Sequence, residues 1–471
     1  MTKSRAATSL EGVYETLSPE PLLTKEQLQA FYGEELNRIR GGDQMALMEL
    51  GLNRRHGGAY YKAFLMGHSG VGKSTELTRL INAVENKFRA IRFSALSDLD
   101  PANFRPFDVP LVMMIKIAEE TAKPINQGGA GHEPSDKVLQ DIWNWFATET
   151  RTHSQQTHVG AEAAAGMNPG ALTWWTKALG LFASLKGEIK YASDRNKQIV
   201  EYRLSRLASL VELLNRLLDE CNDLLRETTG CEWLLIGEDF DRAGIPDDLT
   251  KALFLNYANL FKDLRTHLIF NIPISLVYSE KRPQLPALSD PVHCIPDTPV
   301  FDEDHTPHQE GREALRAILE ARVSLELFEP DVCARLIVAS GGNLRDLFSL
   351  VSQAADNALL RPDCNGKVND ADADRVIDAL RTDYERRLGE SVFDEAKVTY
   401  EDKAERLLKI YSQDQTAKIP NAVLHSLLHA RAVQEFNGKR WFGVHPLVVD
   451  ILHAQGRIKA SVDGKVRGGT E

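Results

Sequence analysis

The sequence predicts an α/β fold built around a parallel β-sheet, and three observations lead to this prediction. Short apolar segments typical of buried strands alternate with helical patterns over the first 300 or so residues. A glycine-rich loop lies between the first of these strands and the helix that follows it. Beyond residue 307 the pattern becomes helical up to a short final hairpin. The 471 residues suffice for about three domains of roughly 150 residues each.

Short apolar segments are predicted to form the strands of the sheet. They lie at residues 60–66, 90–94, 233–237, 267–272 and 291–300. Helical patterns separate them at residues 73–84, 109–120, 198–227 and 250–264. Because parallel strands are joined by helical crossovers, this alternation favours a sheet with helices on its faces.

The C-terminal third is predicted to hold a helical region and then a small mixed module. Helical patterns follow one another at residues 311–327, 330–340, 343–358 and 370–388. The module offers helices at 401–411 and 420–429, strands at 432–436 and 440–444 joined by an Asn-Gly turn, and a helix from residue 445. Two helices, a hairpin and a further helix are the outline of a winged-helix domain.

Composition excludes several classes of protein. Lys and Arg number 56 against 67 Asp and Glu, and the resulting charge of −11 excludes a protein that coats nucleic acid with its whole surface. No long apolar run predicts a transmembrane helix, and the N-terminus lacks the apolar stretch of a secretion signal. The 5 cysteines are widely spaced and contain no C-x-x-C pair, so we expect buried thiols and a cytoplasmic location.

The strongest chemical signal is a full match to the phosphate-loop pattern G-x-x-x-x-G-K-[ST]. The matching segment is Gly67-His68-Ser69-Gly70-Val71-Gly72-Lys73-Ser74, followed by Thr75. Glycines let the backbone fold around an oxyanion, and the next helix points its positive end inward. Lys73 is expected to reach the β- and γ-phosphates of ATP, Ser74 to bind Mg²⁺, and Thr75 to contact the α-phosphate. The sequence therefore predicts a site for ATP and Mg²⁺.

Such a site needs acidic residues at the end of a neighbouring strand, and the segment 233–242 supplies them. An apolar run and Gly237 lead into Glu238, Asp239, Phe240, Asp241 and Arg242. Acids at the carboxyl end of a central strand face the phosphates. We assign Glu238 to Mg²⁺ and Asp239 to the attacking water; the reverse assignment stays open, because the strand register can differ by one residue.

Other polar positions are candidates for contact with the terminal phosphate or the water. Asn271 ends the next strand, where its amide can hydrogen-bond either group. Arg345 lies in the first turn of a helix, where a cation opposes the helix dipole unless a phosphate is near. Lys281 and Arg282 are candidates for a cation supplied to a neighbouring subunit's nucleotide, with a solvated surface pair as an equal alternative.

Two histidine pairs are interpreted as structural, because neither comes with a full set of metal ligands. They are His305 with His308, and His425 with His429. Residues 124–196 form an irregular insertion with glycine- and alanine-rich runs and an aromatic helix at residues 171–185. This helix is too short to span a bilayer, and we interpret it as packing on its own domain, with a partner-binding or membrane-surface hairpin as the alternative.

The terminal module, residues 395–471, is mildly basic within an acidic chain. It carries 12 Lys and Arg against 9 Asp and Glu, a net +3. Lys439 and Arg440 lie just past the hairpin turn, and further basic residues follow the last helix. A basic wing tip and tail can contact DNA phosphates, and winged helices also dock on proteins.

Together these motifs resemble a bacterial AAA+/STAND-type P-loop ATPase with a C-terminal winged helix, over about residues 20–455. The resemblance rests on the phosphate loop, the E-D-x-D-R strand end, the polar end of the next strand and the G-G-N-L-R-D-L helix start. It implies an ASCE-class sheet of order 5-1-4-3-2, a helical lid, Asn271 as the first sensor and Arg345 as the second. The Gly-Glu-Asp start of the acidic motif departs from the commoner aspartate-first form, which leaves the Mg²⁺ ligand open.

The resemblance also divides the chain and suggests its role. The expected regions are an N-terminal helical segment (1–57), an ATPase core (58–300), a lid (301–392), a winged helix (393–460) and a basic flexible tail (461–471). The implied function is an ATP-hydrolysing switch that controls a partner protein, such as an effector of antiviral defence, and forms a homo-oligomer on ATP binding. Two alternatives stay open: a DNA-associated AAA+ loader or transposition regulator, and a nucleotide-binding scaffold with little hydrolysis.

Overall fold

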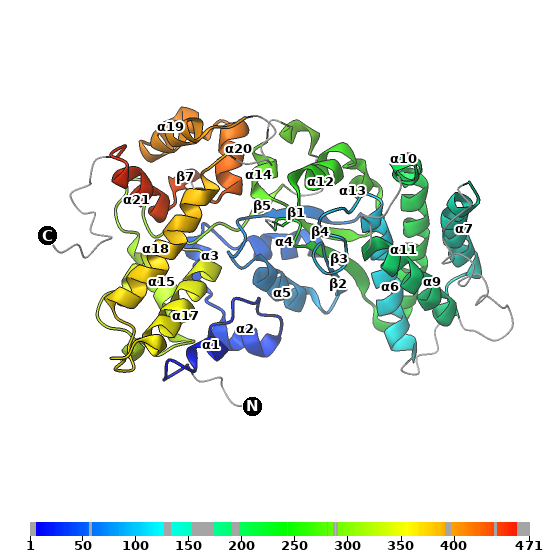
Figure 1. Ribbon diagram of the computed structural model, residues 1–471. Helices are drawn as coiled ribbons and strands as arrows, with labels where there is room; N and C mark the ends of the chain where they lie inside the picture. Colours follow the sequence, from blue (N-terminus) through cyan, green and yellow to red (C-terminus); the bar gives the residue numbers. More distant parts are fainter. Residues whose placement is uncertain are drawn as a thin grey trace.

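Figure 1 shows the arrangement of the chain in a computed structural model, with a sheet in the middle, a group of helices at one end, and further helices with a hairpin at the other. The structure describes residues 6–55, 59–126, 133–152, 174–190, 197–242, 244–279, 281–285, 288, 291–390, 397–437 and 440–458. None of the helices in these ranges is long and apolar enough to cross a membrane.

Five parallel strands form the sheet in the order β2-β3-β4-β1-β5, which confirms the predicted order 5-1-4-3-2. They are β1 (Lys62–Met66), β2 (Phe88–Ser94), β3 (Glu232–Glu238), β4 (His267–Asn271) and β5 (His293–Cys294). β5 is much shorter than the predicted strand at 291–300. Prolines 291, 296 and 299 flank the two paired residues, and proline has no N–H to donate to the ladder.

Alternating side chains divide the core into two clusters, one on each face of the sheet. Leu65 of β1 and Ile236 of β3 belong to a cluster that includes α4 (Gln44–Asn53) and α5 (Lys73–Val84). Their neighbours Phe64 and Leu235 belong to a larger cluster on the opposite face, which includes α6 (Asp108–Asn126) and α11 (Leu207–Thr229). Burial on both faces explains why these strands read as continuous apolar runs.

The helices of the insertion and the helices that flank it in the sequence stand beside the sheet at one end of the molecule (Figure 1). They are α6 (Asp108–Asn126), α7 (Asp136–Thr152), α9 (Trp174–Lys190), α10 (Lys197–Ser205) and α11 (Leu207–Thr229). Trp174 is buried and its indole N–H donates to the carbonyl of Ser135, so α9 packs on its own domain as expected. The run at 159–171 lies outside the described residues.

Two predicted helices are broken. The helix expected at 198–227 is interrupted at Arg206, which has a non-helical backbone and whose guanidinium lies over the rings of Trp145 and Tyr202. The helix expected at 250–264 is three pieces, namely α12 (Asp247–Lys251), the π-helix η2 (Ala252–Asn256) and α13 (Asn259–Asp263). Short elements α14 (Ile274–Val277) and η3 (Arg282–Gln284) follow β4.

The predicted lid region is helical. It contains α15 (Gln309–Glu320), η4 (Leu325–Leu327), α16 (Val332–Ala339), α17 (Leu344–Leu360) and α18 (Asp370–Arg387). α15 ends seven residues before the predicted boundary at 327. Just past this end, Val323 forms a parallel β-bridge with Ala7 of the N-terminal segment. A residue paired in this way is extended, so the helix does not continue to residue 327. The N-terminal segment contributes α1 (Val13–Thr16), α2 (Lys25–Phe31) and α3 (Glu35–Ile39).

The C-terminal module has the predicted order of helix, helix, hairpin and helix. Its elements are α19 (Tyr400–Tyr411), η5 (Gln415–Lys418), α20 (Ala422–His429), β6 (Val433–Phe436), β7 (Trp441–Val444) and α21 (Pro446–Ala454), with β6 and β7 antiparallel. Its assignment as a winged helix stays a prediction.

The hairpin of this module packs on the rest of the chain. All residues of β6 are buried. The amide of Gln434 donates to the carbonyl of Gly341 at 2.8 Å, and that of Asn437 donates to the carbonyl of Cys294 at 3.0 Å. Arg440, one of the two wing cations, pairs with Glu435 and lies over the ring of Tyr278. Lys439 and the tail 461–471 lie outside the described residues.

Candidate nucleotide-binding site

The phosphate loop joins the carboxyl end of β1 to α5, and its glycines are required by its path. Gly67, Gly70 and Gly72 have φ values of 149°, 94° and 100°, which side chains rarely allow. A Cβ at Gly67 would lie 2.2 Å from the carbonyl oxygen of Ile295. One at Gly70 would lie 2.4 Å from Oδ1 of Asn343. The loop therefore passes too close to its neighbours for any other residue at these positions.

Lys73 is buried in the loop with its ammonium fully engaged. Nζ donates to the carbonyls of Gly67 at 2.8 Å and His68 at 2.7 Å, and it pairs with the Asp241 carboxylate at 2.7 Å. The side chain of Asp241 is as buried as that of Lys73, at 6% exposure. Sequence reasoning gave Asp241 no role. The sequence feature that could have identified Asp241 as a site residue is its position two residues after Asp239 in the same acidic segment.

The two acids assigned to metal and water face different neighbours. Glu238 is buried and forms a two-point ion pair with Arg92 of β2, with distances of 2.5 and 2.9 Å. It is absent from the described cavity lining, which does include Asp239 and Asp241. The assignment of Glu238 to Mg²⁺ therefore stays a prediction that requires its carboxylate to leave Arg92.

Asp239 lies at the turn after β3 with a positive φ of 64°. Its carboxylate accepts hydrogen bonds from the Ser94 hydroxyl at 2.6 Å and from Nε of Arg242 at 2.8 Å. Burial acts to raise the pKa of Asp239, but these hydrogen bonds outweigh it, so the pKa lies below its ordinary value. Asp239 is therefore a carboxylate at neutral pH.

Both predicted sensor residues line the same cavity as the loop. Asn271 ends β4 with 1% exposure, and its Oδ1 has no hydrogen-bond partner among the described residues. A guanidinium N–H of Arg345 donates to the Ser69 hydroxyl at 2.7 Å. In contrast, Lys281 and Arg282 lie at the start of η3 and are exposed, outside the described lining.

A buried network that the sequence did not reveal joins the loop to the lid. The His68 ring and the Asn343 amide both contact the Asp297 carboxylate at 2.8 Å, and the same amide donates to the carbonyl of Ser69 at 3.1 Å. Burial acts to raise the pKa of Asp297, but its bonds to His68 and Asn343 and the nearby Arg431 hold it well below the usual range. Asn343 also caps α17, since its side chain accepts the N–H of Asp346.

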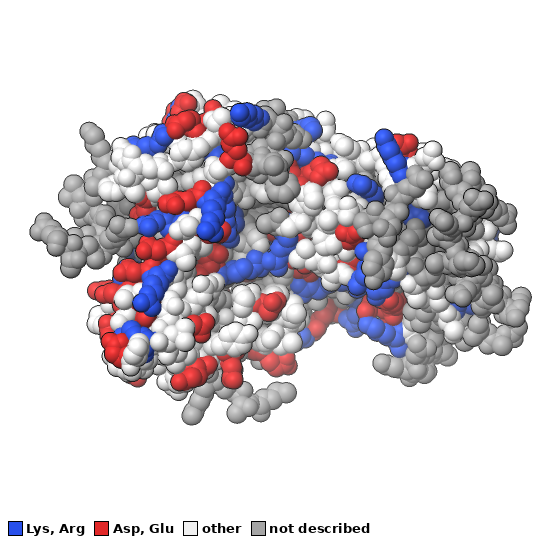
Figure 2. Space-filling view, in the orientation of Figure 1, with Lys and Arg blue, Asp and Glu red and all other residues white. Residues whose placement is uncertain are grey.

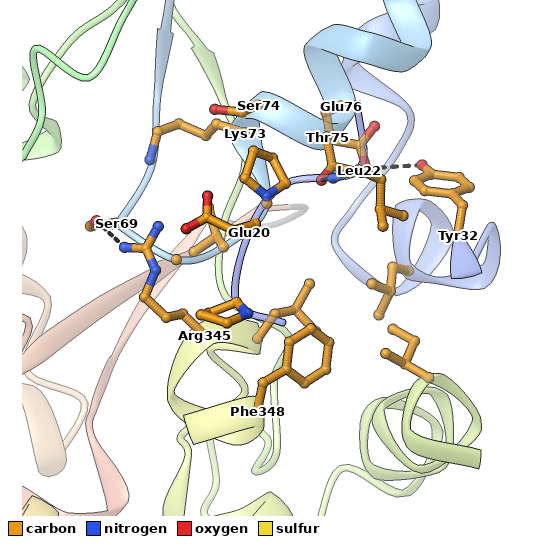
Figure 3. A pocket seen from close by; sticks show the side chains of 18 of the residues that line it. Glu20, Leu22, Tyr32, Ser69, Lys73, Ser74, Thr75, Glu76, Arg345 and Phe348 are labelled. Carbon is orange, nitrogen blue, oxygen red and sulfur yellow. Dashed lines mark hydrogen bonds between the residues drawn. The ribbon is translucent and has the colours of Figure 1, made fainter. Parts of the chain in front are cut away.

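The N-terminal segment forms another wall of the site. Residues 18–22 line the cavity (Figure 3), and the Leu22 N–H donates to the Thr75 hydroxyl at 3.1 Å. Thr75, expected to touch the α-phosphate, therefore also holds this segment. Arg40, a buried residue that follows α3, donates to the carbonyl of Val71 inside the loop at 3.1 Å.

The cavity measures about 910 Å³ including its open mouth and has a polar and an apolar part. Figure 3 shows Tyr32 and Phe348 on the side away from the Lys73 ammonium. Arg322 lies over the rings of Phe31 and Phe348, at 4.8 and 4.9 Å from their centres. An apolar pocket with rings next to a phosphate loop suits a purine base.

The phosphate loop at the end of β1, the sheet order and the helical region over the loop define the fold. It is a P-loop NTPase fold of the ASCE class. No family model matches the sequence, and no curated protein matches it.

Three solved structures are similar to the chain at low identity. They are Cdc6p from Pyrobaculum aerophilum (14% identity, 93% of this chain and 96% of that chain, TM-score 0.36), the Walker-type ATPase PABY2304 of Pyrococcus abyssi (14%, 93% and 99%, 0.37) and the Aeropyrum pernix ORC2 protein in ADPNP–ADP complexes (12%, 91% and 100%, 0.37). The strand order and the phosphate loop remain the observations that define the fold.

Three of the four histidines singled out from the sequence have side-chain contacts within the fold. His308 accepts the N–H of Gly311 and caps α15, and His305 stacks on Tyr411. His425 lies 3.6 Å from the Asp247 carboxylate. Within the described ranges, no three His, Cys, Asp or Glu side chains gather to hold a metal ion.

Proposed function

We propose that the protein is an ATP-binding and ATP-hydrolysing switch in which the nucleotide joins the core, the lid and the N-terminal segment. The observation that carries this proposal is that all three parts already meet on the phosphate loop. Arg345 of α17 donates to Ser69, and the backbone of Leu22 donates to Thr75. A nucleotide in the cavity would touch all three at once, so loss of its γ-phosphate can change how they are held together.

The residues of the site suit a phosphoryl transfer to water. The water oxygen attacks the γ-phosphorus, the bond to the β–γ bridging oxygen breaks with its electron pair leaving on ADP, and the water's proton passes to a base. Asp239, ionised at neutral pH, and Asn271 can orient that water. Lys73 would exchange Asp241 for the phosphates. The hydroxyl of Ser74 and a carboxylate of Glu238, Asp239 or Asp241 are hard oxygen donors that would hold Mg²⁺, which neutralises phosphate charge when bound.

The output of the switch is the C-terminal module, through which we propose that a partner protein is controlled. Arg431 pairs with Asp346 of α17 at 2.5 Å, and Asp346 directly follows Arg345. Movement of α17 would therefore alter how the module is docked. Arg440 pairs with Glu435 of the same hairpin and lies over the ring of Tyr278, while its side chain stays 53% exposed. An oligomer formed on ATP binding and an antiviral partner rest on the family resemblance alone.

Replacing Lys73 tests this function. The variant Lys73→Ala should lose ATP binding and phosphate release, because the loop lacks its cation for the β- and γ-phosphates. Titration with a fluorescent ATP analogue and a phosphate-release assay measure the two steps. The matched control is Lys409→Ala, whose lysine pairs with Glu405 on the exposed face of α19. Wild-type nucleotide affinity in Lys73→Ala would contradict the site, and binding without phosphate release in the wild type would favour the scaffold.

A further inference from the structure

Two arginines from different parts of the fold converge on one hydroxyl of the phosphate loop. Arg345 enters from the first turn of α17, and its guanidinium lies 2.7 Å from the Ser69 hydroxyl. Arg242 enters from the turn after β3, and its guanidinium lies 3.4 Å from the same oxygen. Both side chains line the cavity, and Figure 3 shows the contact between Arg345 and Ser69 beside Glu20.

The positive charge at this point is only partly balanced. Asp239 holds Nε of Arg242 and leaves its NH1 group directed at Ser69. None of the described carboxylates lies within 4.0 Å of the Arg345 guanidinium. Burial and then repulsion from Arg242 lower the pKa of Arg345. Figure 2 shows Lys and Arg side chains gathered in the hollow at the centre of this face. Two partly buried guanidinium groups on one hydroxyl repel each other, and an anion between them would relieve this repulsion.

We propose that Arg242 and Arg345 form a clamp, within a single chain, for the terminal phosphate of ATP. The clamp rests on the proposed function and goes beyond it by assigning a catalytic role to Arg242. A guanidinium matches phosphate oxygens with parallel N–H donors, and a cation on the transferred phosphate is worth about 10³–10⁵ in rate. Asp239 becomes the positioning residue for Arg242. The clamp supplies from within the chain the cation that would otherwise come from a neighbouring subunit, so hydrolysis needs no second copy.

The test compares triphosphate with diphosphate binding. Affinities for ATPγS and ADP, and phosphate release over a dilution series of the protein, are measured in the wild type, Arg242→Ala, Arg242→Lys and Arg316→Ala. Arg316 is an exposed arginine of α15 that pairs with Glu320, far from the loop in sequence, and serves as the matched control.

Arg242→Ala should weaken ATPγS binding by roughly 10- to 100-fold, the worth of a charged hydrogen bond, while ADP affinity stays within about twofold. Phosphate release should fall by about 10³-fold or more. Arg242→Lys should recover part of the ATPγS affinity, because it keeps the charge without the fork of donors. Arg316→Ala should match the wild type. In the wild type, release per chain should not change on dilution.

Two results would overturn the clamp. The first is that Arg242→Ala keeps the wild-type preference for ATPγS over ADP. The second is that phosphate release per chain in the wild type rises with protein concentration while Arg242→Ala hydrolyses ATP normally. ADP affinity reports whether the variant site is folded, and Arg242→Lys provides the same comparison if the alanine variant unfolds. A wild type that binds neither nucleotide would refute the proposed function itself, and the clamp with it.

Discussion

Lys73 and Asp241 form a buried ion pair at the point where the β- and γ-phosphates are expected. Their side chains are each 6% exposed, and 2.7 Å separates Nζ from the carboxylate. A buried pair adds little net stability, but removal of one partner leaves the other charge uncompensated. Phosphate bound in the loop would take the ammonium from Asp241 and free this carboxylate for another contact. Asp241 and the nucleotide phosphates therefore compete for the Lys73 ammonium.

Replacing Asp241 should weaken the nucleotide-free protein more than the nucleotide-bound one. Asp241→Asn should lower the free energy of unfolding by about 3 kcal/mol without nucleotide, since Lys73 keeps only its two carbonyl partners. Added ATPγS should restore most of this loss. Urea unfolding with and without ATPγS measures both. Asp223→Asn, which removes an exposed partner of Arg226, should change little. Equal losses with and without nucleotide would contradict the competition.

His445 makes the junction of lid and C-terminal module sensitive to pH. The ring is 1% exposed, stacks on Tyr384 and accepts the N–H of Leu447. Burial, opposed by Asp346 and reinforced by Arg431, lowers the pKa of His445 to about 4. The unfolded chain then binds a proton at higher pH than the folded one. This contribution to stability is complete above pH 6.5 and is lost as the pH falls towards 4.

The loss should reach about 3 kcal/mol, from about 1.4 kcal/mol per pKa unit. Asn can cap a helix but does not titrate in this range. The free energy of unfolding should therefore fall less steeply between pH 6.5 and 4.5 in His445→Asn than in the wild type, as measured by urea unfolding at each pH. Identical slopes would mean that other groups cause the acid sensitivity.

At the scale of elements, local pattern predicted the strands, while contacts distant in sequence set the rest. The apolar run and the acids of β3 stand together in the chain, so they could be read directly. Gly237 lies inside this strand because of a neighbour that is distant in sequence: a Cβ there would lie 2.5 Å from the ring of Phe270. At the break in the predicted helix 198–227, Arg206 contacts the rings of Trp145 and Tyr202, and helical periodicity does not reveal such contacts.

The network that joins loop and lid had no local signal. His68 and Asp297 are 229 residues apart, and Arg40 and Thr298 are 258 apart. Asn343 belongs to the G-G-N-L-R-D-L helix start, but the sequence did not assign its side chain to the network. Its role in holding the loop became visible once the fold brought Ser69 and Asp297 to its amide. Motif residues of this site were therefore predictable, and the residues that hold the motif were not.

The cap of α17 offers a test of that coupling. Asn343→Ala should destabilise the protein by about 1 kcal/mol through the lost cap and should also weaken nucleotide binding, since the loop loses the amide on Ser69. Asn421→Ala removes a similar cap from α20, with a 2.9 Å bond to Leu424, away from the loop. Both variants should lose stability in urea unfolding. Only Asn343→Ala should lose ADP affinity. Equal ADP affinities in the two variants would mean that Asn343 acts only as a helix cap.

At the scale of the whole molecule, the C-terminal module is tied to the part of the lid that meets the nucleotide. Arg431 and Asp346 form a largely buried ion pair across this junction, and the neighbouring Arg345 contacts the loop. The hairpin adds Gln434 on Gly341, just before the same helix. If nucleotide changes the position of α17, it must change the docking of the module, and linkage requires the reverse effect to be equal.

Breaking the Arg431–Asp346 pair should therefore alter nucleotide affinity from a distance. Arg431→Ala leaves Asp346 without its partner and should change ATPγS affinity by about fivefold or more, the lower bound of typical coupling. Arg457→Ala breaks a pair with Glu401 inside the module and should leave affinity unchanged. Hydrogen exchange gives the reciprocal measurement: ATPγS should change protection of β6 in the wild type but not in Arg431→Ala. Suppose that both variants bind ATPγS as the wild type does and that ATPγS leaves the hydrogen-exchange protection of β6 unchanged. The module is then fixed to the lid without being controlled by the nucleotide.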